Sequence, residues 1–99
     1  MGAKRRMRPS KLAIKLLKIR NAFGCTQDEM CVRLKTQNRK LKQLTKQHIS
    51  SYENGHREPS ILVLLAYARI AGVNMELIVD DRLILPDGLP VELKHKVIE

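Results

Sequence analysis

At 99 residues the chain can form one small domain with flanking tails, and with 43% hydrophobic residues but no Trp, one Phe and two Tyr, its core must come from Leu, Ile, Val and Met. The formal net charge of +9 is unevenly spread, since residues 1–60 hold 15 Lys and Arg against 4 Asp and Glu, and residues 61–99 hold 4 against 6. A basic half beside a slightly acidic half indicates a polyanionic partner on one face. Nucleic acid is favoured over a membrane surface, because the apolar faces of the predicted helices, described below, are needed to form the core.

The first predicted helix runs from Lys11 to about Ala22, with Ser10 as N-cap and Gly24 as C-terminal stop. At 100° per residue its apolar positions share one inward face, formed by Leu12, Leu16, Ile19 and Phe23. The opposite, outward face carries Lys11, Lys15, Lys18 and Asn21. Arg20 falls inside the apolar stripe, so it either reaches the surface or needs a buried carboxylate. Glu53 is the candidate partner, because it lies on the inward half of the third predicted helix.

A second helix is predicted to start after Thr26, which is its N-cap and forms a capping box with Glu29. Its inward face is supplied by Met30, Cys31 and Leu34. Residues 35–43 contain no Gly or Pro and four positive charges, so they either extend this helix by several turns or form a long basic loop.

A third helix is predicted from Lys46 to about Asn54, between Thr45 as N-cap and Gly55 as its end. Ile49 and Tyr52 form its inward side. The outward side is polar and uncharged, and it consists of Gln47, Ser50, Ser51 and Asn54.

Two further helices complete an all-α prediction. Ile61 to Ala71 is apolar almost all round, which places it at the centre of the domain, and Gly72 ends it. Asn74 is the expected cap of a short fifth helix, Met75 to about Asp80. The predicted organisation is a basic arm at residues 1–9, a domain at 10–80 and a tail at 81–99.

Several kinds of site are disfavoured by the residue pattern. Cys25 and Cys31 have no CxxC spacing, so we expect two buried thiols in a reducing compartment, not a disulfide or a zinc site. No apolar run reaches membrane-spanning length and no signal-peptide core follows the basic start, so a cytoplasmic location is expected. His48, His56 and His95 are scattered, and neither a Gly-rich phosphate loop nor a Ser/His/Asp arrangement occurs, so we expect no metal, no cofactor and no enzyme activity.

In order and spacing, these pieces resemble the Cro/CI-type (XRE) helix-turn-helix family of phage repressors and bacterial regulators, over roughly residues 12–80. The matching stretches are Thr26 to Met30, Ile49 to Gly55, Arg57 to Ser60 and Val63 to Val73. The resemblance implies a five-helix, phage-repressor-like DNA-binding domain in a small transcriptional regulator, such as a repressor, that binds double-stranded DNA as a homodimer. Helix-turn-helix proteins usually join the second and third helices by a turn of about four residues, so the connection here is unusually long.

The resemblance also implies roles for individual residues. The third predicted helix would be the recognition helix in the major groove, and the positions that reach base edges fall on Lys46, Gln47 and Ser51, with Ser50 close by. Phosphate contacts fall on Gln27, which also braces the recognition helix, and on Asn54 and Arg57. Arg20 and Glu53 match a buried ion pair of many family members, in agreement with the helical-wheel interpretation.

Three alternatives stay open. The cations of the long connection (Lys35, Arg39, Lys40 and Lys42) either add phosphate contacts beside the groove or only attract DNA nonspecifically. The basic arm is either a solubilising tail or reaches the minor groove. The competing function is an antitoxin-like or adaptor module whose tail, residues 82–99, binds a protein partner, although that tail could equally form the homodimer interface or fold back on the first helix. RNA binding is disfavoured because the polar face lacks aromatic side chains for stacking.

Overall fold

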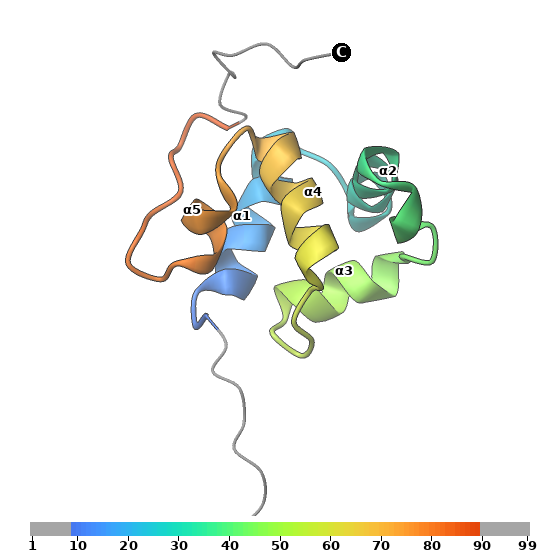
Figure 1. The fold of residues 1–99 in the computed structure, drawn as a ribbon, viewed down its shortest axis with the longest axis horizontal. Helices are drawn as coiled ribbons and strands as arrows, with labels where there is room; N and C mark the ends of the chain where they lie inside the picture. Colours follow the sequence, from blue (N-terminus) through green and yellow to red (C-terminus); the bar gives the residue numbers. More distant parts are fainter. Residues whose placement is uncertain (1–8, 90–99) are drawn as a thin grey trace, which may run out of the picture.

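The structure, a computed structural model, describes residues 9–89, which form five α-helices, one 3-10 turn and no strand (Figure 1). The elements are α1 (Leu12–Phe23), α2 (Gln27–Gln37), η1 (Arg39–Leu41), α3 (Lys46–Glu53), α4 (Ile61–Ala71) and α5 (Met75–Val79). The all-α fold with five helices is therefore confirmed. Most of the predicted basic arm, and the tail from residue 90, lie outside the described residues.

The core is centred on α4, which packs against α1, α2 and α5, while α3 packs against α1 and α2 (Figure 1). The aliphatic composition supplies this core, and its fully buried large side chains are Leu16, Ile19, Met30, Leu34, Ile49, Tyr67 and Ile78. Cys25 and Cys31 are free thiols buried within it, as predicted. None of the helices in residues 9–89 is long and apolar enough to cross a membrane.

Local end signals set most of the helix boundaries. Gly24 ends α1 in the left-handed conformation, with φ 63°, which glycine adopts without a Cβ clash. Thr26 Oγ1 accepts from Glu29 N at 3.1 Å, and Glu29 Oε1 accepts from Thr26 N at 2.8 Å, so the predicted capping box of α2 is present. Asn74 occupies the N-cap position of α5, but its side chain makes no capping hydrogen bond.

The predicted N-cap of α1 is wrong, although the helix begins at Leu12, within one residue of the predicted start. Ser10 does not cap the helix, because its hydroxyl donates to Asp81 Oδ2 at 3.0 Å. The carboxylate of Asp81 accepts the amides of Ser10 at 2.7 Å and Lys11 at 3.0 Å. The unpaired amides at the start of this helix thus find their acceptor about seventy residues away in sequence, after α5.

The prediction that Lys15 faces outward is also wrong, since only 6% of this residue is exposed. Its ammonium group donates to the backbone carbonyls of Leu77 and Asp80, each at 2.8 Å. These carbonyls lie at the C-terminal end of α5, where unpaired oxygens and the helix dipole favour a cation. The lysine is buried because α5 packs across this face of α1.

The chain after α5 runs back beside α1. Lys18 Nζ donates to Leu85 O and forms an ion pair with Asp87, both at 3.2 Å. Leu85 is only 3% exposed and belongs to the core, and Leu89 packs against it. The described part of the tail therefore folds back on the first helix, and the core continues past residue 80.

The connection between α2 and α3 (residues 38–45) is neither a helix of several turns nor an open loop. Helix α2 continues to Gln37, and then Asn38 Oδ1 accepts from Lys40 N at 2.8 Å and starts the single turn η1. Leu41 and Leu44 are each only 6% exposed and belong to the hydrophobic core. Two buried leucines therefore anchor this basic connection to the domain.

Candidate nucleic-acid interface

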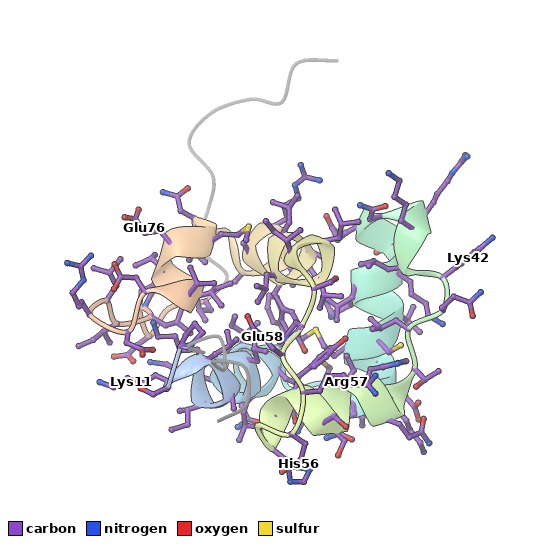
Figure 2. The ribbon with its side chains drawn as sticks, turned by 60° about the horizontal axis from the view of Figure 1, so that its bottom comes forward. Lys11, Lys42, His56, Arg57, Glu58 and Glu76 are labelled. Atoms are coloured by element: carbon purple, nitrogen blue, oxygen red, sulfur yellow. The ribbon has the colours of Figure 1, made fainter. Side chains whose placement is uncertain are left out.

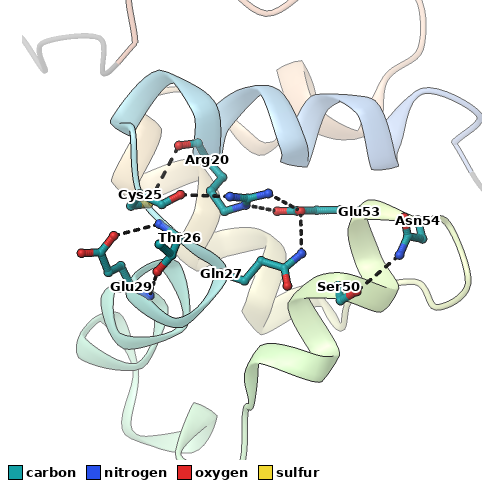
Figure 3. Close-up of polar contacts among 8 residues, drawn as sticks. All are labelled: Arg20, Cys25, Thr26, Gln27, Glu29, Ser50, Glu53 and Asn54. Atoms are coloured by element: carbon teal, nitrogen blue, oxygen red, sulfur yellow. Dashed lines mark hydrogen bonds and ion pairs between the residues drawn. The ribbon is translucent and has the colours of Figure 1, made fainter.

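One carboxylate of the candidate recognition helix, α3, joins it to α1 and α2. Glu53, in the last turn of α3, accepts from Arg20 Nε at 2.7 Å and from Arg20 Nη2 at 2.9 Å (Figure 3). Gln27 at the start of α2 donates to the same carboxylate at 3.1 Å. Arg20 also donates to the carbonyl of Cys25 at 3.0 Å, in the turn between α1 and α2.

This network is largely shielded from water. The side chain of Glu53 is 5% exposed and that of Arg20 is 18% exposed. The hydrogen bond to Glu53 raises the pKa of the Arg20 guanidinium, against the lowering effect of burial. The Arg20–Glu53 pair is bidentate, and Gln27 donates a further hydrogen bond to the carboxylate of Glu53. This geometry fixes the end of α3 against α1 and α2.

The other end of α3 is fixed by a contact that the sequence patterns did not reveal. The backbone amide of Thr45 donates to His48 Nδ1 at 3.0 Å, and the His48 ring stacks on Tyr52 with centroids 6.4 Å apart. His48 thus stands at the third helical position, where a capping box usually holds Glu or Gln. The position of His48 three residues after Thr45 could have indicated this contact from the sequence, but a histidine indicates a capping box only weakly.

The predicted base-reading residues share the outward side of α3. Lys46 and Gln47 are exposed, and Ser50 and Ser51 are half-buried. Opposite them, Ile49 is fully buried and Tyr52 is 5% exposed, so these two side chains hold the helix in the domain. The result is a helix that is apolar on its inner side and presents amide, hydroxyl and ammonium groups outward.

The predicted phosphate-contacting residues lie near the C-terminal end of α3. Asn54 is exposed, and its amide donates to Ser50 Oγ at 3.3 Å (Figure 3). The backbone amide of Arg57 donates to Ser51 O at 3.3 Å, which folds the turn after α3 against the helix and leaves the arginine exposed. Gln27 is half-buried against Glu53, so it braces α3 at the side where α2 begins.

A carboxylate also lies close to the outward surface of α3. Asp28 Oδ2 is 3.8 Å from Lys46 Nζ, and the two side chains are 72% and 55% exposed. An ion pair this long and this exposed contributes little stability, so the lysine can leave it at small cost. Within residues 9–89, no group of three His, Cys, Asp or Glu side chains could hold a metal ion.

Comparison with known proteins agrees with this geometry. The profile of the helix-turn-helix family matches residues 16–78, more than half of the chain and from the middle of α1 to α5. No curated protein and no solved structure gives a significant match. The matched range contains α2, α3, the long connection between them and the ion pair that ties α3 to α1. The chain therefore belongs to the helix-turn-helix DNA-binding family of the Cro/CI (XRE) type.

Proposed function

We propose that the protein is a small cytoplasmic transcriptional repressor that recognises a specific double-stranded DNA sequence with α3 in the major groove. Family membership supports DNA binding, and one observation carries the finer proposal. The outward side of α3 is polar and open to solvent, while its inner side and both its ends are fixed by Ile49, Tyr52, Glu53 and His48. A helix held this rigidly can present its side chains to base edges at small entropic cost.

The side chains that would read the bases have suitable chemistry. Gln47 can pair with the N6 and N7 positions of adenine through both atoms of its amide. Lys46 donates to the guanine acceptors, and the hydroxyls of Ser50 and Ser51 serve as donors or acceptors. In the free protein the ammonium group of Lys46 is 3.8 Å from Asp28, and the guanine edge would replace this weak contact.

Phosphate contacts would flank the reading surface and set its register on the duplex. Gln27, at the start of α2, donates a hydrogen bond to Glu53 in the last turn of α3. Asn54 and Arg57 lie beyond the last turn of α3, where the chain turns toward α4. Contacts of this kind position the protein without carrying sequence information, and they make affinity depend steeply on salt.

Family members usually bind pseudo-palindromic sites as dimers, so we propose a homodimer as the binding unit. The competing proposal, an adaptor that captures a protein partner through its tail, is favoured by one observation, since Ile84 is 82% exposed beside the buried Leu85. Deletion of residues 90–99 combined with Ile84→Asp tests it while leaving Leu85 in the core. Intact DNA binding with loss of a co-purifying partner supports the adaptor, whereas loss of dimerisation supports the regulator.

Selection of bound duplexes from a random pool, followed by alanine substitution, tests the proposed function. Gln47→Ala should weaken the preferred duplex by roughly 1–3 kcal/mol at one base position and leave binding of mismatched duplexes nearly unchanged. Gln37→Ala is the matched control, because Gln37 is an exposed glutamine at the end of α2, outside the proposed reading surface. Uniform weakening of all duplexes by Gln47→Ala would contradict the assignment of α3 to the groove.

A further inference from the structure

The connection between α2 and α3 is the part of this chain that departs most from the helix-turn-helix pattern, and the structure shows that it is built in as a fixed element. Leu41 and Leu44 enter the core, and the side chain of Asn38 starts the turn η1 between them and α2. The free thiol of Cys31 lies 3.3 Å from the carbonyl of Leu44, so the connection packs directly on α2. The two buried leucines therefore hold the connection in one position on the domain.

The same connection carries a concentration of exposed positive charge. Arg39, Lys40 and Lys42 are all exposed. The sequence contains no Asp or Glu between Glu29 and Glu53. Within residues 9–89 none of the three cations forms an ion pair. Burial of Leu41 therefore holds exposed cations close together at the surface, where their combined positive potential attracts an anion.

Two hollows beside the recognition helix are lined by basic side chains, one from the connection and one from α2. Lys40 lines a hollow of about 310 Å³ together with His48 of α3 and Arg57 of the following turn; Glu58 supplies the negative charge there. On the other side, Lys35 lines a second hollow with Lys46 and Gln47, between α2 and α3.

Lys42 points outward from the connection, at the opposite end of the view from Lys11 and Glu76 (Figure 2). Lys40 thus lies beside α3, and Arg39 and Lys42 are exposed neighbours of Lys40 in the same connection.

We propose that the α2–α3 connection is a second DNA-binding element, in which Arg39, Lys40 and Lys42 bind backbone phosphates beside the groove entered by α3. This proposal rests on the proposed function of α3 and adds a contact that lengthens the footprint on the duplex. The ligand is the phosphodiester backbone, so the contact is independent of base sequence. Its positions are ordered before binding by Leu41 and Leu44, which reduces the entropy lost when the phosphates are engaged.

The salt dependence of binding measures this contact. Each phosphate neutralised by a cation contributes about 0.9 to the slope of log affinity against log salt, so three contacts contribute about 2.7. Between 50 and 200 mM salt this corresponds to roughly a 40-fold smaller loss of affinity for a variant without them. The variant Arg39→Gln, Lys40→Gln, Lys42→Gln keeps Leu41 and Leu44 and should melt at the wild-type temperature.

The matched control is Lys11→Gln, Arg33→Gln, Arg69→Gln, which also removes three exposed positive charges but none from the connection or from α3. We expect the connection variant to lower the slope by about 2–3 on both selected and random duplexes, with an unchanged ratio between them. In a phosphate-ethylation interference assay, ethylation of certain phosphates should weaken binding of the wild-type protein but not binding of the connection variant. Equal slopes for the two triple variants would overturn the proposal, including the case in which the cations serve an acidic protein partner.

The failure of this proposal and of the proposed function are distinguishable. If wild-type protein binds a selected duplex specifically but the connection variant retains the wild-type slope, only the role of the connection fails. If wild-type protein shows no preference for any duplex, the groove assignment of α3 fails, whatever the slope of the variant.

Discussion

The network around Glu53 makes the sharpest prediction about stability. Glu53→Ala removes a 5% exposed carboxylate that accepts two hydrogen bonds from Arg20 and one from Gln27. It also leaves the guanidinium of Arg20 without its counter-charge while that side chain is only 18% exposed. Removal of one partner of a buried pair typically costs about 3–5 kcal/mol, and the partial exposure of Arg20 favours the lower end.

Thermal unfolding followed by circular dichroism measures this loss. For a domain of this size, 1 kcal/mol shifts the melting temperature by about 4–8 °C, so a loss near 3 kcal/mol should lower it by roughly 12–24 °C. Glu76→Ala is the control, because Glu76 is an exposed glutamate on α5 and should shift melting by only a few degrees. If Glu53→Ala melts like Glu76→Ala, the assignment of the buried pair as the brace of α3 is refuted.

A double variant separates the loss of charge pairing from the loss of packing. Arg20→Met with Glu53→Leu removes both charges and fills a similar volume, so it should recover a large part of the stability lost in Glu53→Ala. Its expected defect is in DNA binding, because Gln27 then has no carboxylate to hold it beside α3. Recovery of both stability and specific binding would show that the pair does not position the recognition helix.

Two further predictions concern acidic residues near the ends of helices. Hydrogen bonds from the backbone amides of Lys11 and Ser10 lower the pKa of Asp81. Its carboxylate therefore stabilises the fold at any pH above the ordinary aspartate pKa of about 3.9. This stabilisation is lost as the pH falls through the lowered pKa. Asp81→Asn should therefore melt below wild type at pH 7 and lose less stability than wild type as the pH falls below about 4, whereas parallel pH profiles would contradict this. Asp28→Asn removes the carboxylate 3.8 Å from Lys46 and should raise affinity for random duplexes, by up to about fivefold at low salt. Unchanged or weaker binding in a gel-shift assay would contradict the assignment of the outward surface of α3, beside Asp28, to the DNA interface.

Features encoded by neighbouring residues could be predicted from the sequence. The left-handed end of α1 at Gly24 and the capping box of Thr26 with Glu29 depend on residues within one helical turn, and both are present. The pairing of Arg20 with Glu53 was also predictable, although the two are far apart in sequence. Each falls on the inward side of its own helix, and two opposite buried charges require each other.

The features that could not be predicted depend on contacts between distant segments. Nothing in the first fifteen residues indicates that Asp81 accepts the amides at the start of α1, or that α5 covers Lys15. A helical wheel shows which residues share a face but not which neighbouring element covers its flank. Leu41 was missed for a similar reason, since a single leucine among cations resembles a solvated segment until its contacts are known.

The most direct test of the groove assignment removes single atoms from the DNA. In a selected duplex, each purine is replaced in turn by its 7-deaza analogue, which lacks the major-groove acceptor N7, or by its 3-deaza analogue, which lacks the minor-groove acceptor N3. Affinities are measured for wild-type protein and for Gln47→Ala. We expect one 7-deaza position to weaken wild-type binding but not binding of the variant, and no 3-deaza position in the centre of the site to matter. Losses confined to 3-deaza positions, or a 7-deaza effect that persists fully in Gln47→Ala, would contradict the reading of bases by α3.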